Sequence, residues 1–211
     1  MTLKQKYDYL IRYFEAERPN ATSELHYNSA FQLLVAVVLS AQCTDKRVNM
    51  ITPVLFEHYP TPTQLAAASL EDIFHIVKSV SYPNSKSAHL KGLAEKISRE
   101  FHGEVPSTRE GLESLPGVGR KTANVMLSVW FHQPAMAVDT HVFRVANRLG
   151  IVQHADTPLE VEKQLTQHFP KALIHKAHHW LILHGRYVCT AKKPKCTSCG
   201  LEPICDKNEK N

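Results

Sequence analysis

The sequence has no apolar run long enough to cross a bilayer. The longest, Leu33–Leu39, is far shorter than the roughly 20 residues that a membrane-spanning helix needs, so we expect a buried core segment. The first residues mix charged and apolar side chains and have neither the apolar stretch nor the cleavage site of a secretion signal. These absences predict a cytoplasmic protein without a membrane partner.

The sequence also lacks the sustained alternation of apolar and polar residues that marks half-buried strands. Internal repeats, low-complexity tracts and long flexible linkers are absent as well. Apolar residues recur at helical spacing instead, as at Leu3, Tyr7 and Leu10, and Gly103 and Gly150 stand where helices should stop. The pattern predicts an all-α fold of about ten short helices.

Two helix starts are indicated by capping boxes, in which side chains at the first and fourth positions satisfy each other's backbone N–H groups. Ser107 with Glu110 is one, and Thr157 with Glu160 is the other.

Charge and cysteine content narrow the function classes only slightly. A formal net charge of +5 permits a polyanionic partner, and residues 186–211 carry six Lys or Arg against three acids, a plausible phosphate-facing surface. Five cysteines, an odd number without a secretion signal, favour reduced thiols or metal ligands over disulfides.

The segment LPGVGRKTANVMLSV (115–129) predicts a tight turn that leads into a helix. Gly117 and Gly119 allow a sharp turn and a close backbone approach, and N–H groups there suit a phosphate, although a purely structural turn fits equally well. Lys121 would lie in the first helical turn beside Arg120, where the positive end of the helix disfavours the ammonium form. A neutral amine is what a Schiff-base lysine requires, but a solvated surface lysine is the commoner case.

Asp139, in AVDTHVFRVANR (137–148), precedes another apolar-periodic helix. Its simplest role is an N-cap worth about 1 kcal/mol. A carboxylate at a helix start can also stabilise a cationic transition state or transfer a proton.

Four cysteines near the C-terminus form the pattern C-x6-C-x2-C-x5-C: Cys189, Cys196, Cys199 and Cys205. Four thiolates this close can surround one metal centre, and the single short step with irregular gaps favours a four-iron cluster over zinc. Cys43 stands apart, and we expect a buried structural thiol there.

Taken together, several segments closely resemble the bacterial endonuclease III family, and the resemblance is collinear over nearly the whole chain. They are LSAQCTD (39–45), NSKS (84–87), GEVP (103–106), LPGVGRKTANV (115–125), AVDTHVFRVANRLG (137–150), HHWLILHGRYVC (178–189) and the cysteine tail. The resemblance implies the two-lobed, all-helical fold of the helix–hairpin–helix DNA glycosylases. One lobe would span residues 22–132, and the other residues 1–21 with 133–211, including a [4Fe-4S] cluster loop at 188–206.

The resemblance also implies a bifunctional enzyme of base excision repair, a DNA glycosylase and abasic-site lyase. It would be a monomer that acts on double-stranded DNA with damaged pyrimidines or abasic sites. The damaged base would be flipped out, Lys121 would attack C1′ to leave a Schiff base, and Asp139 would stabilise the sugar cation. β-Elimination would then cut the strand.

The DNA contacts that the resemblance implies come from five segments. They are Gln42, Tyr82, Gly117, Val118, Gly119, Arg120, His141, Arg144, Lys192 and Lys193. Gln42 would fill the space left by the flipped nucleotide. The sequence departs from the family at Ser81-Tyr82-Pro83, where relatives place a leucine wedge at the position of Tyr82; an aromatic ring there could still intercalate.

Three alternatives remain open. The histidines at 175, 178, 179 and 184 have spacings that suggest a metal site, although structural hydrogen bonding is favoured. A relative that removes adenine from mismatches shares the fold, but it lacks the lysine found here at 121 and carries a further C-terminal domain. A non-catalytic DNA-binding protein stapled by iron or zinc would bind duplex without cutting it.

Overall fold

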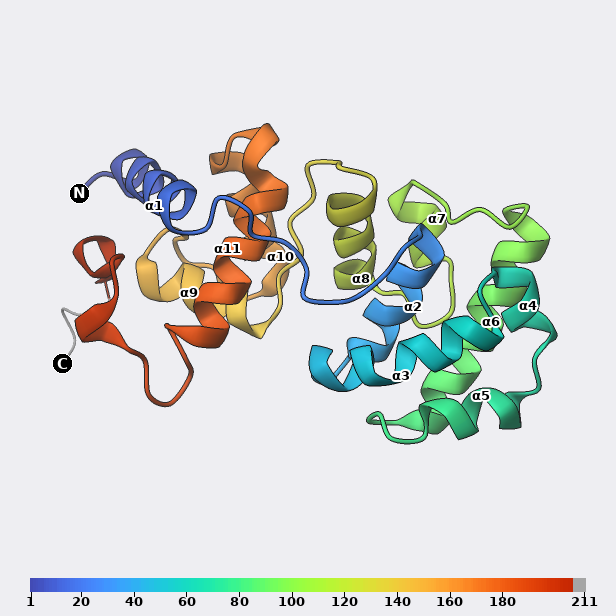
Figure 1. Ribbon diagram of the computed structural model, residues 1–211. Helices are drawn as coiled ribbons and strands as arrows, with labels where there is room; N and C mark the ends of the chain where they lie inside the picture. The colour runs from blue at the N-terminus through green and yellow to red at the C-terminus, as the bar shows by residue number, and fades with distance from the viewer. Residues whose placement is uncertain (207–211) are drawn as a thin grey trace. The chain divides into compact units, whose positions relative to one another are not determined.

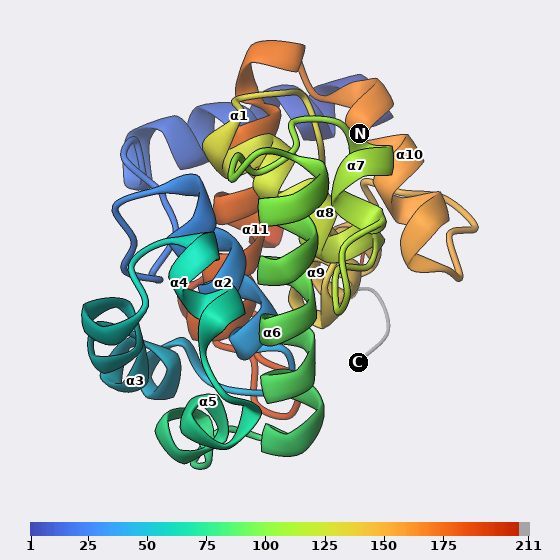
Figure 2. The ribbon, with the colours of Figure 1, turned by 90° about the vertical axis from the view of Figure 1, so that its right-hand side faces the viewer.

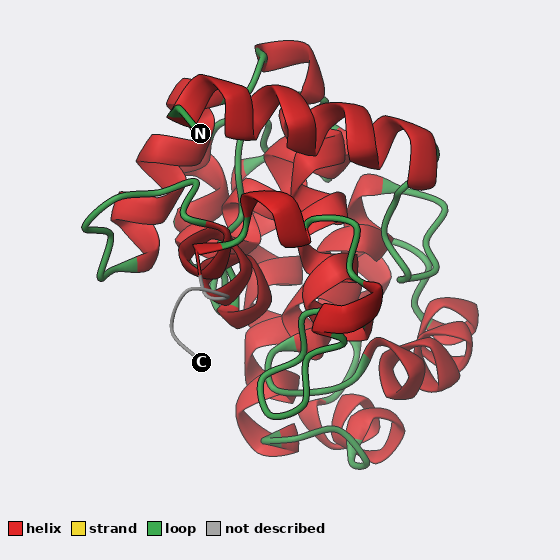
Figure 3. Ribbon diagram, turned by 90° about the vertical axis from the view of Figure 1, so that its left-hand side faces the viewer, coloured by secondary structure: helices red, strands yellow, loops and turns green. Residues whose placement is uncertain are grey.

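The computed structural model describes residues 1–206, and every regular element within that range is a helix (Figure 1, Figure 3). The eleven α-helices of these residues are α1 (Leu3–Glu17), α2 (Ala30–Ser40), α3 (Asp45–His58), α4 (Pro62–Ala67), α5 (Leu70–Val77), α6 (Pro83–Glu100), α7 (Arg109–Glu113), α8 (Arg120–Val125), α9 (Thr140–Leu149), α10 (Pro158–His168) and α11 (Ile174–Tyr187). A π-helical turn, Met126–Trp130, continues α8. No helix of this part of the chain has the length and apolarity to cross a membrane.

The chain forms two compact units. One is Ser23–Phe131, and the other is Met1–Thr22 together with the described residues from His132 onward. These boundaries lie next to those of the lobes that the sequence indicates.

In the Ser23–Phe131 unit, α2 is the central helix. Its segment Leu33–Leu39 is at most 6% exposed, and α2 packs against α3, α6, α8 and the π-helical turn. A helix that is apolar all round is stable only where neighbours cover all of it. Each large side chain buried here contributes roughly 1.5–3 kcal/mol, and the expected core segment is confirmed. The long helix α6 runs beside α4 and α5 (Figure 2).

The core of the other unit joins the two ends of the chain. Phe14 of α1 stacks on Trp180 of α11, with ring centroids 5.6 Å apart and planes inclined by 13°. The Trp180 indole N–H donates to the Arg18 carbonyl oxygen at 2.9 Å, so its one polar atom is satisfied in the core. Helices α9 and α11 pack closely against each other, and Gly150 ends α9 in the left-handed conformation (φ 62°).

Of the two predicted capping boxes, one is confirmed and one is wrong. Thr157 and Glu160 cap α10 reciprocally. At α7 the N-cap is Thr108, whose side chain accepts from the Gly111 N–H, and not Ser107. Adjacent hydroxyl residues offer the same chemistry, so a shift of one position leaves little trace in the sequence.

Candidate active site and cysteine pocket

The predicted hairpin connects α7 and α8 and is built around two exposed glycines. Gly117 has φ 77°, which glycine adopts without steric cost, and the Val118 N–H closes the turn by donating to the Leu115 carbonyl oxygen at 3.1 Å. Val118 is therefore engaged inside the hairpin and buried, whereas it was expected to donate its N–H to DNA. The N–H groups of Gly117 and Gly119 make no hydrogen bond within residues 1–206.

The hairpin rests on α6. A Cβ added at Gly117 would lie 2.8 Å from both Cβ and Cγ of His89, so no other residue fits without displacing α6. At Gly119, by contrast, nothing lies within 4 Å of an added Cβ. The hairpin is packed on one side and open on the other.

Lys121 is the second residue of α8, and its side chain is exposed. The helix continues through buried Ala123 and Asn124, and Arg109 of α7 donates to the side-chain oxygen of Asn124. The side chain of Lys121 is therefore exposed to solvent, while the buried residues of α8 hold the helix against the protein.

Asp139 belongs to the other unit, where it is the N-cap of α9. Its Oδ1 accepts hydrogen bonds from the N–H groups of His141 (2.9 Å) and Val142 (2.8 Å). Both bonds use Oδ1, and Oδ2 makes none within the described residues. The carboxylate is therefore fixed in orientation with one oxygen available for chemistry, so capping and catalysis are compatible here.

Gln42 and Tyr82 are both exposed and both have backbones in the left-handed region. Gln42 (φ 53°) occupies the third position of a type II turn that follows α2, in which the Cys43 N–H donates to the Ser40 carbonyl oxygen at 3.0 Å. Tyr82 (φ 55°, ψ 51°) is the N-cap of α6 and is 64% exposed. This conformation costs a non-glycine residue about 1–2 kcal/mol, and such strain clusters at functional sites.

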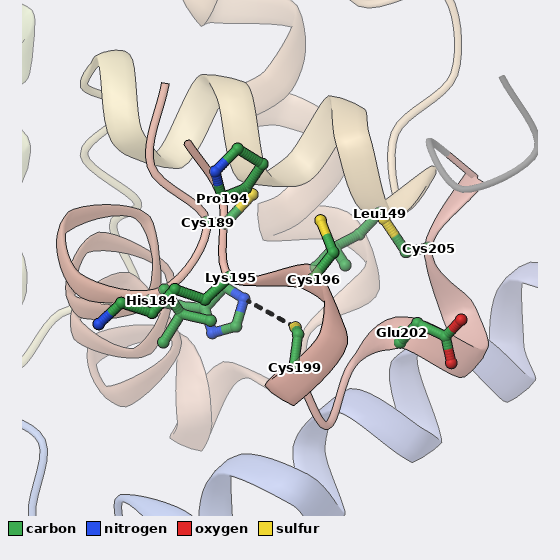
Figure 4. A pocket seen from close by; sticks show the side chains of 10 residues that line it. Leu149, His184, Cys189, Pro194, Lys195, Cys196, Cys199, Glu202 and Cys205 are labelled. Atoms are coloured by element: carbon green, nitrogen blue, oxygen red, sulfur yellow. Dashed lines mark hydrogen bonds between the residues drawn. The ribbon is translucent and has the colours of Figure 1, made fainter. Parts of the chain in front are cut away.

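The four C-terminal thiols line a single pocket, as Figure 4 shows. The other residues of its wall include Leu149, Val188 and Pro194, and the His184 ring nitrogen Nε2 lies 3.6 Å from Cys199 Sγ. Burial raises the pKa of the Cys199 thiol, and the neighbouring cysteines raise it further. Among residues 1–206, no three His, Cys, Asp or Glu side chains are arranged to hold a single metal ion. Four cysteine thiols around one apolar pocket are the donor set that an iron–sulfur cluster uses.

Comparison with known proteins identifies the family. The model of the HhH-GPD superfamily of base excision DNA repair proteins matches residues 35–171. The endonuclease III of Rickettsia conorii is 47% identical over 193 residues, which are 92% of this chain and 91% of that protein. The Escherichia coli endonuclease III is 43% identical over 192 residues, 91% of this chain and 90% of that protein. The chain belongs to the endonuclease III family.

The structural comparison agrees over the full length. A structure of a trapped covalent intermediate between endonuclease III and DNA matches with a TM-score of 0.94 and 44% identity, covering 100% of this chain and 99% of that one. A thermostable thymine-DNA glycosylase, 22% identical with a TM-score of 0.87, shares the fold. The expected helix–hairpin–helix glycosylase fold is therefore confirmed, and the protein is a base excision repair enzyme, a DNA glycosylase with lyase activity.

Arg144, which the resemblance implies as a DNA contact, makes several hydrogen bonds within the protein. Its guanidinium donates to the carbonyl oxygens of Gly185 (2.8 Å) and Cys189 (3.1 Å), and Nη2 lies 3.2 Å from the His141 ring nitrogen Nδ1. In this endonuclease III relative, Arg144 joins α9 to α11 and orients His141.

Lys192 and Lys193 are exposed on the loop between the first two pocket cysteines. A residue that sequence reasoning missed, Arg148, holds this loop: it donates to the carbonyl oxygens of Thr190 (2.8 Å) and Ala191 (3.0 Å). Its place in the last turn of α9, where a cation suits the helix dipole, is the one signal that could have indicated it. Lys207 and Lys210, which also contribute to the basic tail, lie outside the described residues.

Of the four histidines of α11, His178, His179 and His184 are buried, and His175 is partly exposed. The His178 ring nitrogen Nδ1 lies 3.0 Å from the Ala137 carbonyl oxygen. Burial, together with the nearby His178, His175 and Arg186, lowers the pKa of His179 to about 3. Packing and hydrogen bonding account for these residues, as the sequence favoured.

The structure corrects one prediction, at Cys43, and shows one buried residue that the sequence analysis did not single out, Lys86. Cys43 is half-exposed, so the prediction of a buried thiol is wrong; it follows the strained turn at Gln42, beyond the end of the buried helix. Lys86, which the sequence reasoning passed over, is 5% exposed. Helical spacing could have indicated its burial, because Lys86 lies on the same face of α6 as the buried Leu90 and Leu93.

Proposed function

We propose that Lys121 is the nucleophile and Asp139 its carboxylate partner in excising oxidised pyrimidines from duplex DNA. The observation that carries the proposal is the exposed amine of Lys121 directly after the hairpin, in a chain that matches over its full length an endonuclease III that forms a covalent intermediate with DNA. Asp139 supports it, because an N-cap aspartate with Oδ2 unbonded is rigid and still able to interact with a sugar.

The first chemical step replaces the base by the amine. With the damaged nucleotide flipped out of the stack, the Lys121 amine forms a bond to C1′ as the C1′–N glycosidic bond breaks, and the base leaves with that electron pair and takes up a proton. The Asp139 carboxylate stabilises the positive charge that develops on the sugar. Opening of the sugar ring then converts the adduct to a Schiff base between Lys121 and C1′.

Strand cleavage follows from the Schiff base. A base removes a proton from C2′, the electron pair moves toward the protonated imine, and the C3′–oxygen bond breaks with departure of the phosphate. Water then hydrolyses the imine and regenerates the Lys121 amine. The protein needs no external reductant or oxidant for this sequence.

DNA is held, in this proposal, mainly through its backbone. Phosphates approach the N–H groups of Gly117 and Gly119 and the side chains of Arg120, Lys192 and Lys193, contacts that carry no sequence preference and suit a search for lesions. Val118 contributes by fixing the hairpin. Gln42 and Tyr82 insert where the lesion leaves the duplex, and His141, oriented by Arg144, lies near Asp139 on α9.

Borohydride trapping on a duplex that contains an oxidised thymine tests the proposal. The native protein should give a covalent protein–DNA adduct, Lys121→Ala should give none, and the matched loss of an exposed helical lysine in Lys163→Ala should leave the yield unchanged. Absence of an adduct with folded native protein, or an adduct that survives in Lys121→Ala, would contradict the assignment.

We further propose that Cys189, Cys196, Cys199 and Cys205 bind a [4Fe-4S] cluster. When bound, the cluster would cross-link the C-terminal segment, because its binding free energy is part of the folding free energy. About four iron atoms and four sulfides per chain, lost in Cys199→Ser and kept in Cys43→Ser, are expected; stoichiometric zinc in a colourless protein would contradict this.

The remaining aspects of the proposal concern substrate and setting. An enzyme of this family, whose similar relatives are bacterial, would act as a monomer on DNA in the bacterial cytoplasm. Release of adenine from mismatched duplex without an adduct would favour the adenine-removing alternative, and salt-dependent binding without cleavage would favour a non-catalytic module.

A further inference from the structure

Lys86 is only 5% exposed. Its ammonium lies between two loops of the Ser23–Phe131 unit: residues 41–44, which carry Gln42, and residues 78–82, which carry Tyr82. It projects from the first turn of α6, and its Nζ donates to the carbonyl oxygens of Leu39 (2.9 Å) and Ala41 (2.6 Å) at the end of α2. A third hydrogen bond, 3.0 Å long, runs to the Ser81 hydroxyl oxygen in the other loop. Burial lowers the pKa of Lys86, while the nearby Cys43 raises it.

Ser81 completes the connection. Its hydroxyl, which accepts from Lys86, donates to the Gln42 carbonyl oxygen at 2.9 Å, and the Ala41 carbonyl oxygen is 3.2 Å away. Lys86 and Ser81 therefore satisfy the carbonyl groups of both residues at the centre of the type II turn. The turn that carries Gln42 is held directly to the residue before Tyr82.

Both residues next to this connection have strained backbones. Gln42 and Tyr82 keep left-handed backbones without being glycine, and each is exposed. Such a conformation persists only where surrounding contacts determine it. Three hydrogen bonds from one ammonium group, together with those of the Ser81 hydroxyl, supply those contacts at both loops.

We propose that Lys86, with Ser81, is a positioning residue that fastens the Gln42 and Tyr82 loops into one rigid wedge for opening the duplex at a lesion. This inference rests on the proposed function, since it assumes that the two side chains enter DNA. Lys86 itself contacts neither the DNA nor the reacting atoms. Its role is to keep the two exposed tips at a fixed separation, so that they enter the duplex together.

Lys91 provides a matched control within α6. It also donates to two backbone carbonyl oxygens, those of Ala66 (2.9 Å) and Ala68 (2.8 Å), but it secures the end of α4 and touches neither wedge loop. Lys86→Met and Lys91→Met each remove an ammonium that bonds two or more carbonyl groups. Both should lower the melting temperature, whereas only Lys86→Met should impair duplex opening.

The first measurement is the single-turnover rate of base removal from an oxidised thymine, either fully paired in a duplex or in a single strand. For Lys86→Met we expect the maximal rate on the duplex to fall by about tenfold to a hundredfold, with little change on the single strand, where no stack must be opened. Lys91→Met should match the native protein on both substrates. Ser81→Ala, which leaves the two bonds from Lys86 to α2 in place, should give an intermediate loss and carries the test if Lys86→Met does not fold.

The second measurement reports the wedge directly. With 2-aminopurine beside a non-cleavable abasic analogue in a duplex, binding of the native protein should raise the fluorescence as the base unstacks. At a saturating concentration, Lys86→Met should bind the duplex but raise the 2-aminopurine fluorescence much less. A purely structural role would not change this signal at saturation.

The outcomes separate the inference from the function on which it rests. Failure of the native protein to form a borohydride adduct would overturn both. If the native protein forms the adduct but Lys86→Met and Lys91→Met behave alike, or Lys86→Met loses single-strand and duplex activity equally, only the positioning role is overturned.

Discussion

Substitution by alanine should destabilise the protein strongly at one hairpin glycine, Gly117, and hardly at all at the other, Gly119. Gly117 has a left-handed backbone, which costs alanine about 1–2 kcal/mol. The new Cβ would also lie 2.8 Å from His89 Cβ, an atom that no side-chain rotation can move away. Overpacking of this kind costs about 1–3 kcal/mol, so Gly117→Ala should lose about 2–5 kcal/mol in total.

Gly119 offers the contrasting case. Its backbone is extended (φ −94°, ψ 180°), which alanine adopts readily, and no atom lies within 4 Å of the new Cβ. Gly119→Ala should therefore change the free energy of unfolding by less than about 0.5 kcal/mol. The added methyl group would, however, stand where a phosphate must come close to the backbone N–H.

Thermal denaturation and duplex binding at fixed salt measure the two effects. For a protein of this size, each 1 kcal/mol shifts the melting temperature by about 2–4 °C, so Gly117→Ala should melt at least about 4 °C lower. Gly119→Ala should melt like the native protein but bind an abasic duplex more weakly. Equal melting temperatures for the two variants would refute the conformational argument, and native DNA binding by Gly119→Ala would refute close backbone approach at that position.

Three further variants test other parts of the structure. Gly185→Ala should destabilise the protein by about 1–3 kcal/mol in urea denaturation, because its Cβ would lie 2.8 Å from His141 Cβ at the α9–α11 crossing. The folded-state pKa of His179, about 3, lies below its unfolded value near 6.5, so the unfolded state takes up the proton first. The contribution of His179 to the free energy of unfolding should fall by up to about 1.4 kcal/mol for each pH unit below 6.5, so His179→Gln should show a shallower fall than the native protein between pH 6.5 and 5. Gln42→Gly should keep or raise the melting temperature, since glycine suits the turn, yet lower single-turnover base removal; a destabilised variant would contradict the strain at that turn.

Local sequence patterns predicted several parts of the molecule correctly. Helical periodicity placed α1, and the apolar run Leu33–Leu39 identified the buried helix α2, because burial on every side leaves no polar position. Cysteine spacing predicted a shared site, because four thiols in this pattern are typical of one metal centre, and the four thiols line one pocket. The roles of Lys121 and Asp139 came from the family resemblance, and their helix-start positions agree with the pattern read from the residues.

The parts that the sequence did not predict depend on contacts between distant segments. The left-handed backbone at Gln42 carries no glycine or asparagine to mark it, because Lys86, more than 40 residues later, holds the turn from outside. The hydrogen bond from Arg144 to the Cys189 carbonyl oxygen also joins residues far apart in the sequence, so local patterns do not indicate it. Where contacts from distant segments determine a backbone conformation, the preference of the residue itself does not predict it.

Helix α6 links the predicted wedge to the predicted phosphate site. From its first turn Lys86 holds the two wedge loops, and three residues later His89 packs beneath Gly117. Lys96, ten residues after Lys86, donates to the Ser114 carbonyl oxygen at the start of the hairpin, 3.1 Å away. Because an α-helix rises 1.5 Å per residue, these supports are spread over about 15 Å of one rigid rod. The separation between the point where the duplex is opened and the point where its backbone is held is then set by the geometry of a single helix, so a kink in α6, for example from Ala88→Pro, should disturb base flipping and backbone binding together.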